Sequence, residues 1–187
     1  MQQRRTLLTA LFSALIIIGG FIRFPLPPIP ITLQTLFVLL AGLLAGTRVA
    51  FSSVLIYLFL GAVGLPIFTG GGGLAYFVGP TGGYLVGLLP AALISGLAGN
   101  WQLKNSERPF SFLRAALAII LATASIYLCG VALLVYTRSL SWATAAKAGV
   151  LPFLIGDALK GVVALQMART FGPRVRKMLS DPLLLAE

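Results

Sequence analysis

The sequence is poor in charged residues and in the side chains that most enzymes use. It contains no histidine, one cysteine (Cys129) and only four acidic residues among 187. The lack of histidine excludes a serine–histidine triad and most zinc sites, and a single cysteine excludes an internal disulfide framework. No G-x-x-x-x-G-K-[ST] motif is present, so the chain has no recognisable ATP-binding loop. These absences argue against a hydrolase, a zinc enzyme and an ATPase.

The composition instead indicates an integral membrane protein. Hydrophobic residues make up 58% of the chain and charged residues 10%, and the mean hydropathy is +0.99. A soluble domain would carry about 25% charged residues. At about 20 residues per membrane-spanning helix, residues 1–187 are predicted to form a single all-α transmembrane domain with six transmembrane helices.

Six apolar segments fit these spans: residues 7–22, 33–45, 49–64, 81–98, 112–135 and 150–168. The second and third are short, and the Gly46-Thr47-Arg48 step between them predicts a tight turn. Short, glycine-interrupted segments are typical of transport sites. Residues 24–32 contain four prolines and are expected to be extended, with Thr32 as the N-cap of the next helix. Residues 137–147 are expected to be a loop and residues 174–187 a tail.

The net charge of +10 is unevenly distributed, which predicts the orientation. With six spans both termini lie on one side, and Lys and Arg are enriched on the cytoplasmic side. We therefore expect cytoplasmic termini and an external segment at residues 70–79. The ten basic residues on the terminal side, against three on the other, are Arg4, Arg5, Arg48, Lys104, Arg108, Arg114, Arg169, Arg174, Arg176 and Lys177, against Arg23, Arg138 and Lys147.

Residues 70–87 are the most unusual stretch, because eight of the eighteen are glycine. Irregular backbone at membrane depth survives only against protein or a water-filled cavity. One interpretation is a re-entrant loop that lines a binding site. The other is a long outer loop that leads into a helix contact through Gly83 and Gly87, which are four residues apart.

Asp157 is the one acidic residue within a predicted span, and Lys160 follows three residues later on the same helix face. A charge at the centre of the membrane costs about 2.5–3.5 kcal/mol on insertion scales, so intramembrane charges are functional by default. We therefore predict that the pair binds a small molecule. The alternative is a self-neutralising pair that only aids helix packing.

Weaker signals come from uncharged residues. Gln34 and Thr35 lie in the first turn of the second predicted span, where either ligand contact or capping would explain them. Tyr57 lies in the middle of a span, and a buried tyrosine usually pairs its hydroxyl. Ala10 and Ala14 form a small-xxx-small face suited to close helix contact.

Four sequence blocks together resemble the BioY family, the biotin-specific substrate-binding (S) subunits of energy-coupling factor (ECF) transporters. They are P-I-P-I-T-L-Q-T at residues 28–35, Y-L-F-L-G-A-V-G-L-P at 57–66, G-P-T-G-G-Y-L at 79–85 and G-D-A-L-K at 156–160. Their order and spacing fit from the first span to the last. The G-P-T-G-G-Y block combined with the D-x-x-K block is specific, although either alone would be weak.

The resemblance implies an all-α, six-helix S-component fold with a glycine-rich external loop between the third and fourth helices. It implies a multi-pass protein of the bacterial cytoplasmic membrane that captures biotin from outside. The partners would be a membrane coupling protein and a pair of ABC-type ATPases that hydrolyse ATP, so that no cofactor binds to this chain. Ala10 and Ala14 match the alanine motif through which S components contact the coupling protein.

The resemblance also assigns roles around biotin. Asp157 would accept a ureido N–H, and Lys160 would meet the ureido carbonyl or neutralise Asp157. Backbone groups near Gly73, Thr81 and Gly82 would add hydrogen bonds, and an aromatic ring among Tyr76, Phe77 and Tyr84 would cover the ligand. The predicted substrate-binding residues are thus Gln34, Thr35, Tyr57, Gly73, Tyr76, Thr81, Gly82, Tyr84, Asp157 and Lys160.

Three other functions stay open at this point. The chain could act as a stand-alone biotin transporter, since some family members occur without dedicated partners. It could be an intramembrane enzyme that uses Asp157 as a base, although the lack of histidine argues against this. A passive channel is the third alternative, and its uptake would not saturate.

Overall fold

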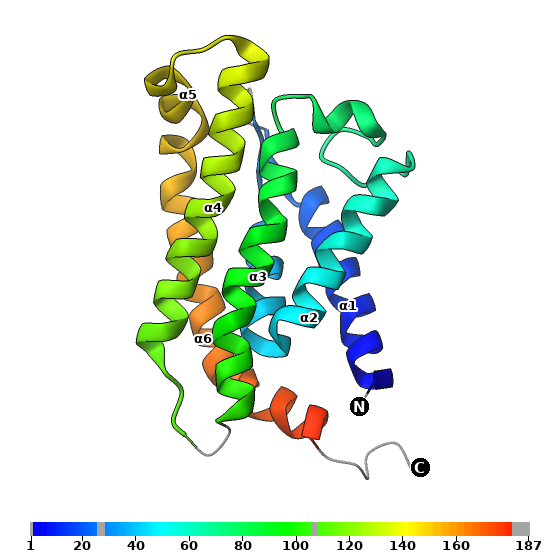
Figure 1. Ribbon diagram of the computed structural model, residues 1–187, viewed down its shortest axis with the longest axis vertical. Helices are drawn as coiled ribbons and strands as arrows, with labels where there is room; N and C mark the ends of the chain where they lie inside the picture. Colours follow the sequence, from blue (N-terminus) through cyan, green and yellow to red (C-terminus); the bar gives the residue numbers. More distant parts are fainter. Residues whose placement is uncertain (1, 26–28, 106–107, 181–187) are drawn as a thin grey trace.

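The computed structural model describes residues 2–25, 29–105 and 108–180, which form a bundle of helices (Figure 1). Five helical segments of the described chain are long and apolar enough to cross a membrane. The long helices are α1 (Gln2–Phe21), α2 (Gln34–Ala62), α3 (Gly82–Lys104), α4 (Phe112–Arg138) and α6 (Leu154–Ser180). The shorter elements are β1 (Arg23–Phe24), β2 (Ile31–Thr32), η1 (Leu74–Phe77), α5 (Trp142–Gly149) and η2 (Leu151–Phe153).

A break at Gly46 divides α2 into two helical arms. Gly46 has φ 81° and ψ 179°, a conformation that costs glycine little and other residues much. The turn is fixed by Asn100 of α3, whose side-chain oxygen accepts from the Thr47 N–H at 3.2 Å and whose amide donates to the Thr47 hydroxyl at 2.8 Å. The predicted tight turn at this point is confirmed. The two predicted spans are the arms of this one broken helix.

Glycines, which have no side chain, allow α3 to pack closely on α2 and on α4. A Cβ on Gly42 would lie 2.7 Å from the Gly96 backbone nitrogen. A Cβ on Gly87 would lie 2.9 Å from the Ile126 Cα of α4, and Gly83 meets the backbone of Cys129 in the same way. Glycines that let backbones approach are the usual means of helix association in lipid. The Gly83–Gly87 pair is therefore a helix contact, as the second interpretation of the glycine-rich stretch expected.

The region between α2 and α3 is mostly irregular. Phe68 and Gly71 exchange backbone hydrogen bonds of 2.8 and 3.2 Å, and η1 follows. The buried Phe68 ring packs edge-on against Tyr57 and Phe77. At the same end of the molecule, β1 pairs antiparallel with β2, so parts of the predicted extended segment form a small ladder.

Three details of the sequence prediction are wrong. Thr32 is not an N-cap, because α2 begins after Leu33 without a side-chain cap; its hydroxyl lies 3.3 Å from the Gln34 side-chain oxygen instead. The predicted loop at 137–147 contains most of α5, whose N-cap Ser141 accepts from the Thr144 N–H at 3.2 Å. The last helix continues through Pro173 to Ser180, because its end is held by the Arg4 side chain, which donates to the Met178 carbonyl.

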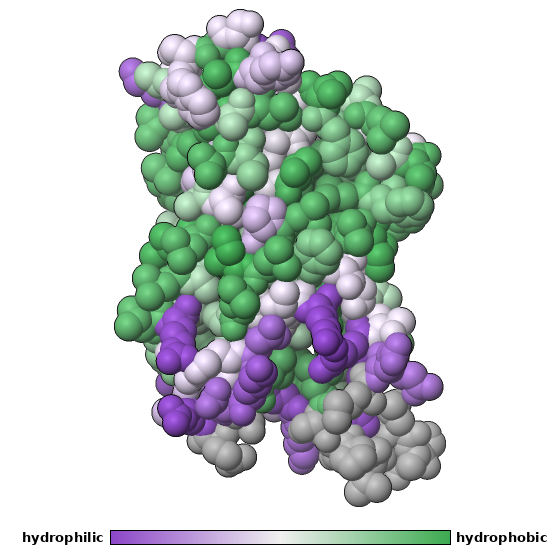
Figure 2. All heavy atoms as spheres, in the orientation of Figure 1, coloured by the Kyte–Doolittle hydropathy of each residue, from purple (hydrophilic) through white to green (hydrophobic). Residues whose placement is uncertain are grey.

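Polar and apolar surfaces are separated along the bundle. Hydrophobic atoms cover the middle of the molecule in Figure 2, and hydrophilic atoms gather at the end where α1 begins, α3 ends and α4 begins (Figures 1 and 2). α6 also ends there (Figure 1). A broad apolar belt with a charged end is the surface expected of a protein that spans a bilayer.

Adding one methyl group at Gly42 tests the close contact between α2 and α3. We expect Gly42→Ala to lower the free energy of unfolding by about 1–3 kcal/mol, the usual cost of overpacking. Gly156→Ala is the matched control, because its Cβ would meet nothing closer than the Ile31 Cγ2 at 3.8 Å. Unfolding in detergent micelles would compare them, and equal stabilities would show that the helices separate easily at Gly42.

Candidate functional site

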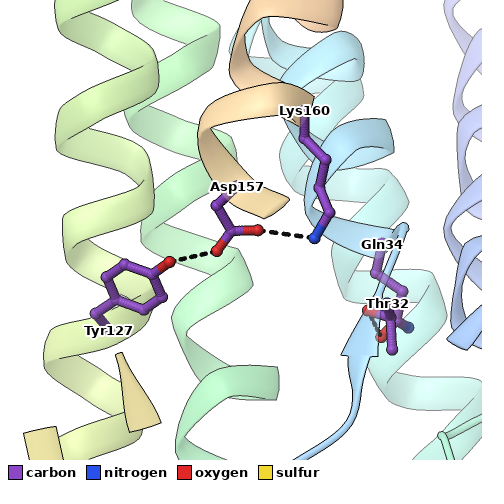
Figure 3. Close-up of polar contacts among 5 residues, drawn as sticks. All are labelled: Thr32, Gln34, Tyr127, Asp157 and Lys160. Atoms are coloured by element: carbon purple, nitrogen blue, oxygen red, sulfur yellow. Dashed lines mark hydrogen bonds and ion pairs between the residues drawn. The ribbon is translucent and has the colours of Figure 1, made fainter. Parts of the chain in front are cut away.

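An ion pair lies inside the bundle on the first turns of α6. The Lys160 Nζ lies 2.7 Å from the Asp157 Oδ1, and the two side chains are 9% and 10% exposed. The second carboxylate oxygen accepts a hydrogen bond of 2.5 Å from the Tyr127 hydroxyl of α4 (Figure 3). Asp157 also lies in the first helical turn, where the helix dipole favours a negative charge. Both carboxylate oxygens are thus held before any ligand arrives.

The pair lies at the wall of a cavity of about 70 Å³ between α2, α3, α4 and α6. The wall is mixed: besides the ion pair it contains apolar side chains, two tyrosines, an amide and four threonines. Such a cavity, mostly apolar with a few polar groups, is the usual form of a small-molecule site. Its lining residues are Ile29, Pro30, Thr32, Gln34, Thr35, Thr69, Thr81, Tyr84, Leu85, Leu88, Ile126, Tyr127, Phe153, Asp157 and Lys160.

On the α2 side, Gln34 is held from behind by Tyr57. The Gln34 amide nitrogen lies 2.6 Å from the Tyr57 hydroxyl, and Gly20 of α1 leaves room for the amide because its own Cβ would come within 3.0 Å of it. Figure 3 shows Gln34 and Thr32 on the opposite side of Lys160 from Asp157. The amide is therefore oriented by a residue that does not itself reach the cavity.

Tyr84 supplies an aromatic wall. Its hydroxyl donates to the Gly149 carbonyl at 3.0 Å, and its ring lies 6.4 Å from that of Phe153. The ring packs directly against Gly130 of α4, where a Cβ would clash with it. With its hydroxyl occupied, Tyr84 offers the cavity its ring.

Comparison with known proteins places this geometry in a family. A sequence model described as the BioY family matches residues 1–177. The chain belongs to the BioY family. This confirms the resemblance drawn from the four sequence blocks.

Curated BioY relatives and a solved structure agree with this assignment. The chain is 38% identical over 169 residues to a probable biotin transporter BioY of Pyrococcus horikoshii, covering 90% of this chain and 96% of that protein. It is 37% identical over 181 residues to the biotin transporter BioY of Rhizobium etli, covering 90% and 93%. A crystal structure of the S-component for biotin from an ECF-type ABC transporter aligns with a TM-score of 0.81 at 27% identity, covering 94% of this chain and 92% of that one. The all-helical fold is therefore that of an ECF S-component.

Six of the residues predicted from the sequence line the cavity of this BioY-family chain: Gln34, Thr35, Thr81, Tyr84, Asp157 and Lys160. Tyr76 lies outside it, on a second hollow of about 340 Å³ formed with Pro30, Thr69, Gly70, Ala75, Gly79, Pro80 and Thr81. The two hollows share Pro30, Thr69 and Thr81. As a ligand contact, each of these residues stays a prediction.

Tyr57, Gly73 and Gly82 do not line the cavity. Tyr57 is fully buried behind Gln34. Gly73 has φ 102° and donates its N–H to the Gly61 carbonyl at 2.7 Å, which ties the glycine-rich segment to the end of α2. Gly82 lies against the Phe77 backbone, where a Cβ would clash. Their places in the structure explain them as supports of the site rather than as parts of its wall.

Tyr127 is the main residue that the sequence analysis missed. It lies in the apolar run of α4, thirty residues before Asp157. The same signal that drew attention to Tyr57, a phenol in the middle of a span, was present at Tyr127. Thr69, Ile29 and Phe153 were also missed, and no local pattern marks them.

Removing one partner of the ion pair should destabilise this BioY-family chain. Lys160→Met leaves the Asp157 carboxylate without its cation, a change that costs about 3–5 kcal/mol for buried pairs. Adding Asp157→Asn removes both charges and should restore most of that loss. Denaturant unfolding in micelles measures both variants. A single variant as stable as the parent would show that water reaches the pair.

Proposed function

We propose that this chain binds biotin from the external side of the bacterial cytoplasmic membrane, as the substrate-binding subunit of an ECF transporter. The observation that carries the proposal is the ion pair of Asp157 and Lys160 at the wall of an otherwise largely apolar cavity. The membership of the BioY family and the names of the relatives support the choice of biotin over other small molecules.

The ureido ring of biotin complements the pair. It offers two N–H donors and one carbonyl acceptor, and a carboxylate and an ammonium are the matching partners. The Tyr127 hydroxyl and the Lys160 ammonium each engage one carboxylate oxygen, and each oxygen keeps a free lone pair for a ligand N–H. The thiophane ring would then pack against Leu85, Leu88 and the Tyr84 ring.

The acid tail of biotin would extend toward the second hollow. That hollow meets the cavity at Pro30, Thr69 and Thr81, whose two hydroxyls are donors for a carboxylate. The cavity of about 70 Å³ is small for the whole molecule, so the tail would occupy the wider space of about 340 Å³ beside Tyr76. Tyr76 would then contact the tail rather than the ring.

The ends of the bundle support the proposed orientation. α1 begins and α6 ends at the same, charged end of the molecule (Figures 1 and 2), which requires an even number of crossings. Counting the two arms of α2 separately gives six. With the positive end in the cytoplasm, both termini are cytoplasmic and residues 70–79 face outside, beside the opening of the site.

Uptake would be driven by partners: a membrane coupling protein and a pair of ABC-type ATPases. The chain has no ATP-binding loop of its own and would bind no cofactor. Ala10 and Ala14 are both exposed on α1, and small exposed residues one turn apart permit a partner helix to approach closely. This face is the proposed docking surface for the coupling protein.

The role of the ion pair in binding can be tested in a variant that keeps its fold. Asp157→Asn combined with Lys160→Met removes two charged hydrogen-bond partners, each worth about 1.5–3 kcal/mol. We expect biotin affinity to fall at least roughly a hundredfold, as measured by calorimetry on the purified chain. Lys147→Met on α5 is the control. If the folded double variant binds biotin like the parent, the pair is structural only.

The docking surface has a separate test. Ala10→Trp with Ala14→Trp should leave biotin binding by the purified chain within about twofold, because the alanines lie on the outer face of α1. Co-purification with the coupling protein and ATP-dependent uptake should both be lost, whereas Ala132→Trp on the exposed face of α4 should keep them. Normal uptake by the double variant would contradict the docking face and favour transport by the chain alone.

A further inference from the structure

A third and larger hollow lies between α4 and α6, on the surface of the bundle. It measures about 450 Å³ and is almost entirely apolar. Its floor is low because several of its residues are alanine or glycine. The residues that line it are Ala116, Ile119, Ile120, Thr123, Ala124, Tyr127, Leu154, Asp157, Ala158, Gly161, Val162 and Leu165.

This groove is separated from the substrate cavity by one hydrogen bond. Tyr127 and Asp157 are the two residues that line both spaces, and they are joined by the bond of 2.5 Å between the tyrosine hydroxyl and the carboxylate. The other side of the Asp157 carboxylate faces Lys160 in the cavity. Whatever fills the groove therefore lies against the back of the site.

The length of the groove and the charge beyond its end indicate what could occupy it. From Ala116 to Tyr127 it extends about 16 Å at 1.5 Å per residue, close to the thickness of one leaflet of a hydrocarbon core of about 30 Å. One helical turn beyond Ala116, the Arg169 guanidinium lies 5.1 Å from the Phe112 ring, at the charged end of the bundle. Arg169 has no acidic partner among the described residues.

We propose that the groove holds one acyl chain of an anionic phospholipid, with its phosphate at Arg169 and the end of the chain against Tyr127. An apolar groove about as long as one leaflet is thick, with a cation one turn beyond its end, is complementary to that molecule. At about 450 Å³ over about 16 Å, its cross-section is about a third of that of a helix 10 Å wide. A single hydrocarbon chain fits it better than a partner helix does.

The bound chain would keep water away from the Tyr127–Asp157 bond. A hydrogen bond in a low-dielectric setting is stronger than one exposed to water, so lipid in the groove stabilises the arrangement of the carboxylate. An effect of bound lipid on biotin affinity would rest on the proposed function, whereas the lipid site itself does not.

The test uses the full chain in vesicles of phosphatidylglycerol or phosphatidylcholine with the same acyl chains. Native mass spectrometry of the released protein counts the retained lipids. We expect one retained phosphatidylglycerol on the parent, at least fivefold lower retention in Ala124→Phe, which fills the groove, and no loss in Ala132→Phe, an exposed alanine of α4 outside it. Ala158→Phe repeats the test from the α6 wall.

Three outcomes would overturn the proposal. Equal retention by Ala124→Phe, Ala158→Phe and the parent would show that the groove is not the lipid site. Loss of retention in Arg169→Gln but in neither phenylalanine variant would mean headgroup contact alone. A dimer of the parent that Ala124→Phe separates would assign the groove to a second copy of the chain. Normal lipid retention with no biotin binding by the parent would keep the lipid site and contradict the proposed function.

Discussion

The ion pair between Asp157 and Lys160 is the interaction on which the site depends. Either charge alone would be costly at membrane depth, and their contact at 2.7 Å makes the pair neutral as a whole. Replacing a buried pair by apolar residues is often neutral or stabilising, so stability alone gives little reason for its presence. Its place at a cavity wall, with Tyr127 holding the second carboxylate oxygen, supports the proposed role in ligand binding.

The rest of the bundle keeps this pair in place through contacts between backbones. Gly42, Gly83 and Gly87 bring α3 close to α2 and α4, and the space left at Gly130 admits the Tyr84 ring. Lipid provides little hydrophobic drive for helix association, so packing of this kind must supply it. The cavity wall is therefore set by helices that cannot easily slide past one another.

Residues that are unusual within a membrane-spanning segment could be identified from the sequence alone. Charges within a span marked Asp157 and Lys160, and the glycine at position 46 marked the break in α2. The six apolar segments also gave the helical class and most of the elements. The break at Gly46 and the helical class are confirmed, because each depends on local properties of the chain, whereas ligand binding by Asp157 and Lys160 stays a prediction.

Features that depend on distant partners were not visible. Tyr127 joins Asp157 across two helices, and the extension of α6 past Pro173 is held by Arg4 at the other end of the chain. The Tyr57 hydroxyl is bonded to Gln34, so Tyr57 supports the wall without lining the cavity, and its contact with a ligand stays a prediction. In each case the position or extent of the residue's element depends on a contact between segments far apart in the sequence, and local sequence patterns do not predict such contacts.

The central claim is that the ion pair receives the ureido ring of biotin. A structure of the purified chain with biotin bound would test it most directly. The account predicts density for the ring in the cavity between α2, α3, α4 and α6, with ureido N–H and carbonyl groups in hydrogen-bond contact with Asp157 and Lys160 and the tail directed toward Thr81. Density for biotin elsewhere, or with its ureido ring away from both charged groups, would contradict the account.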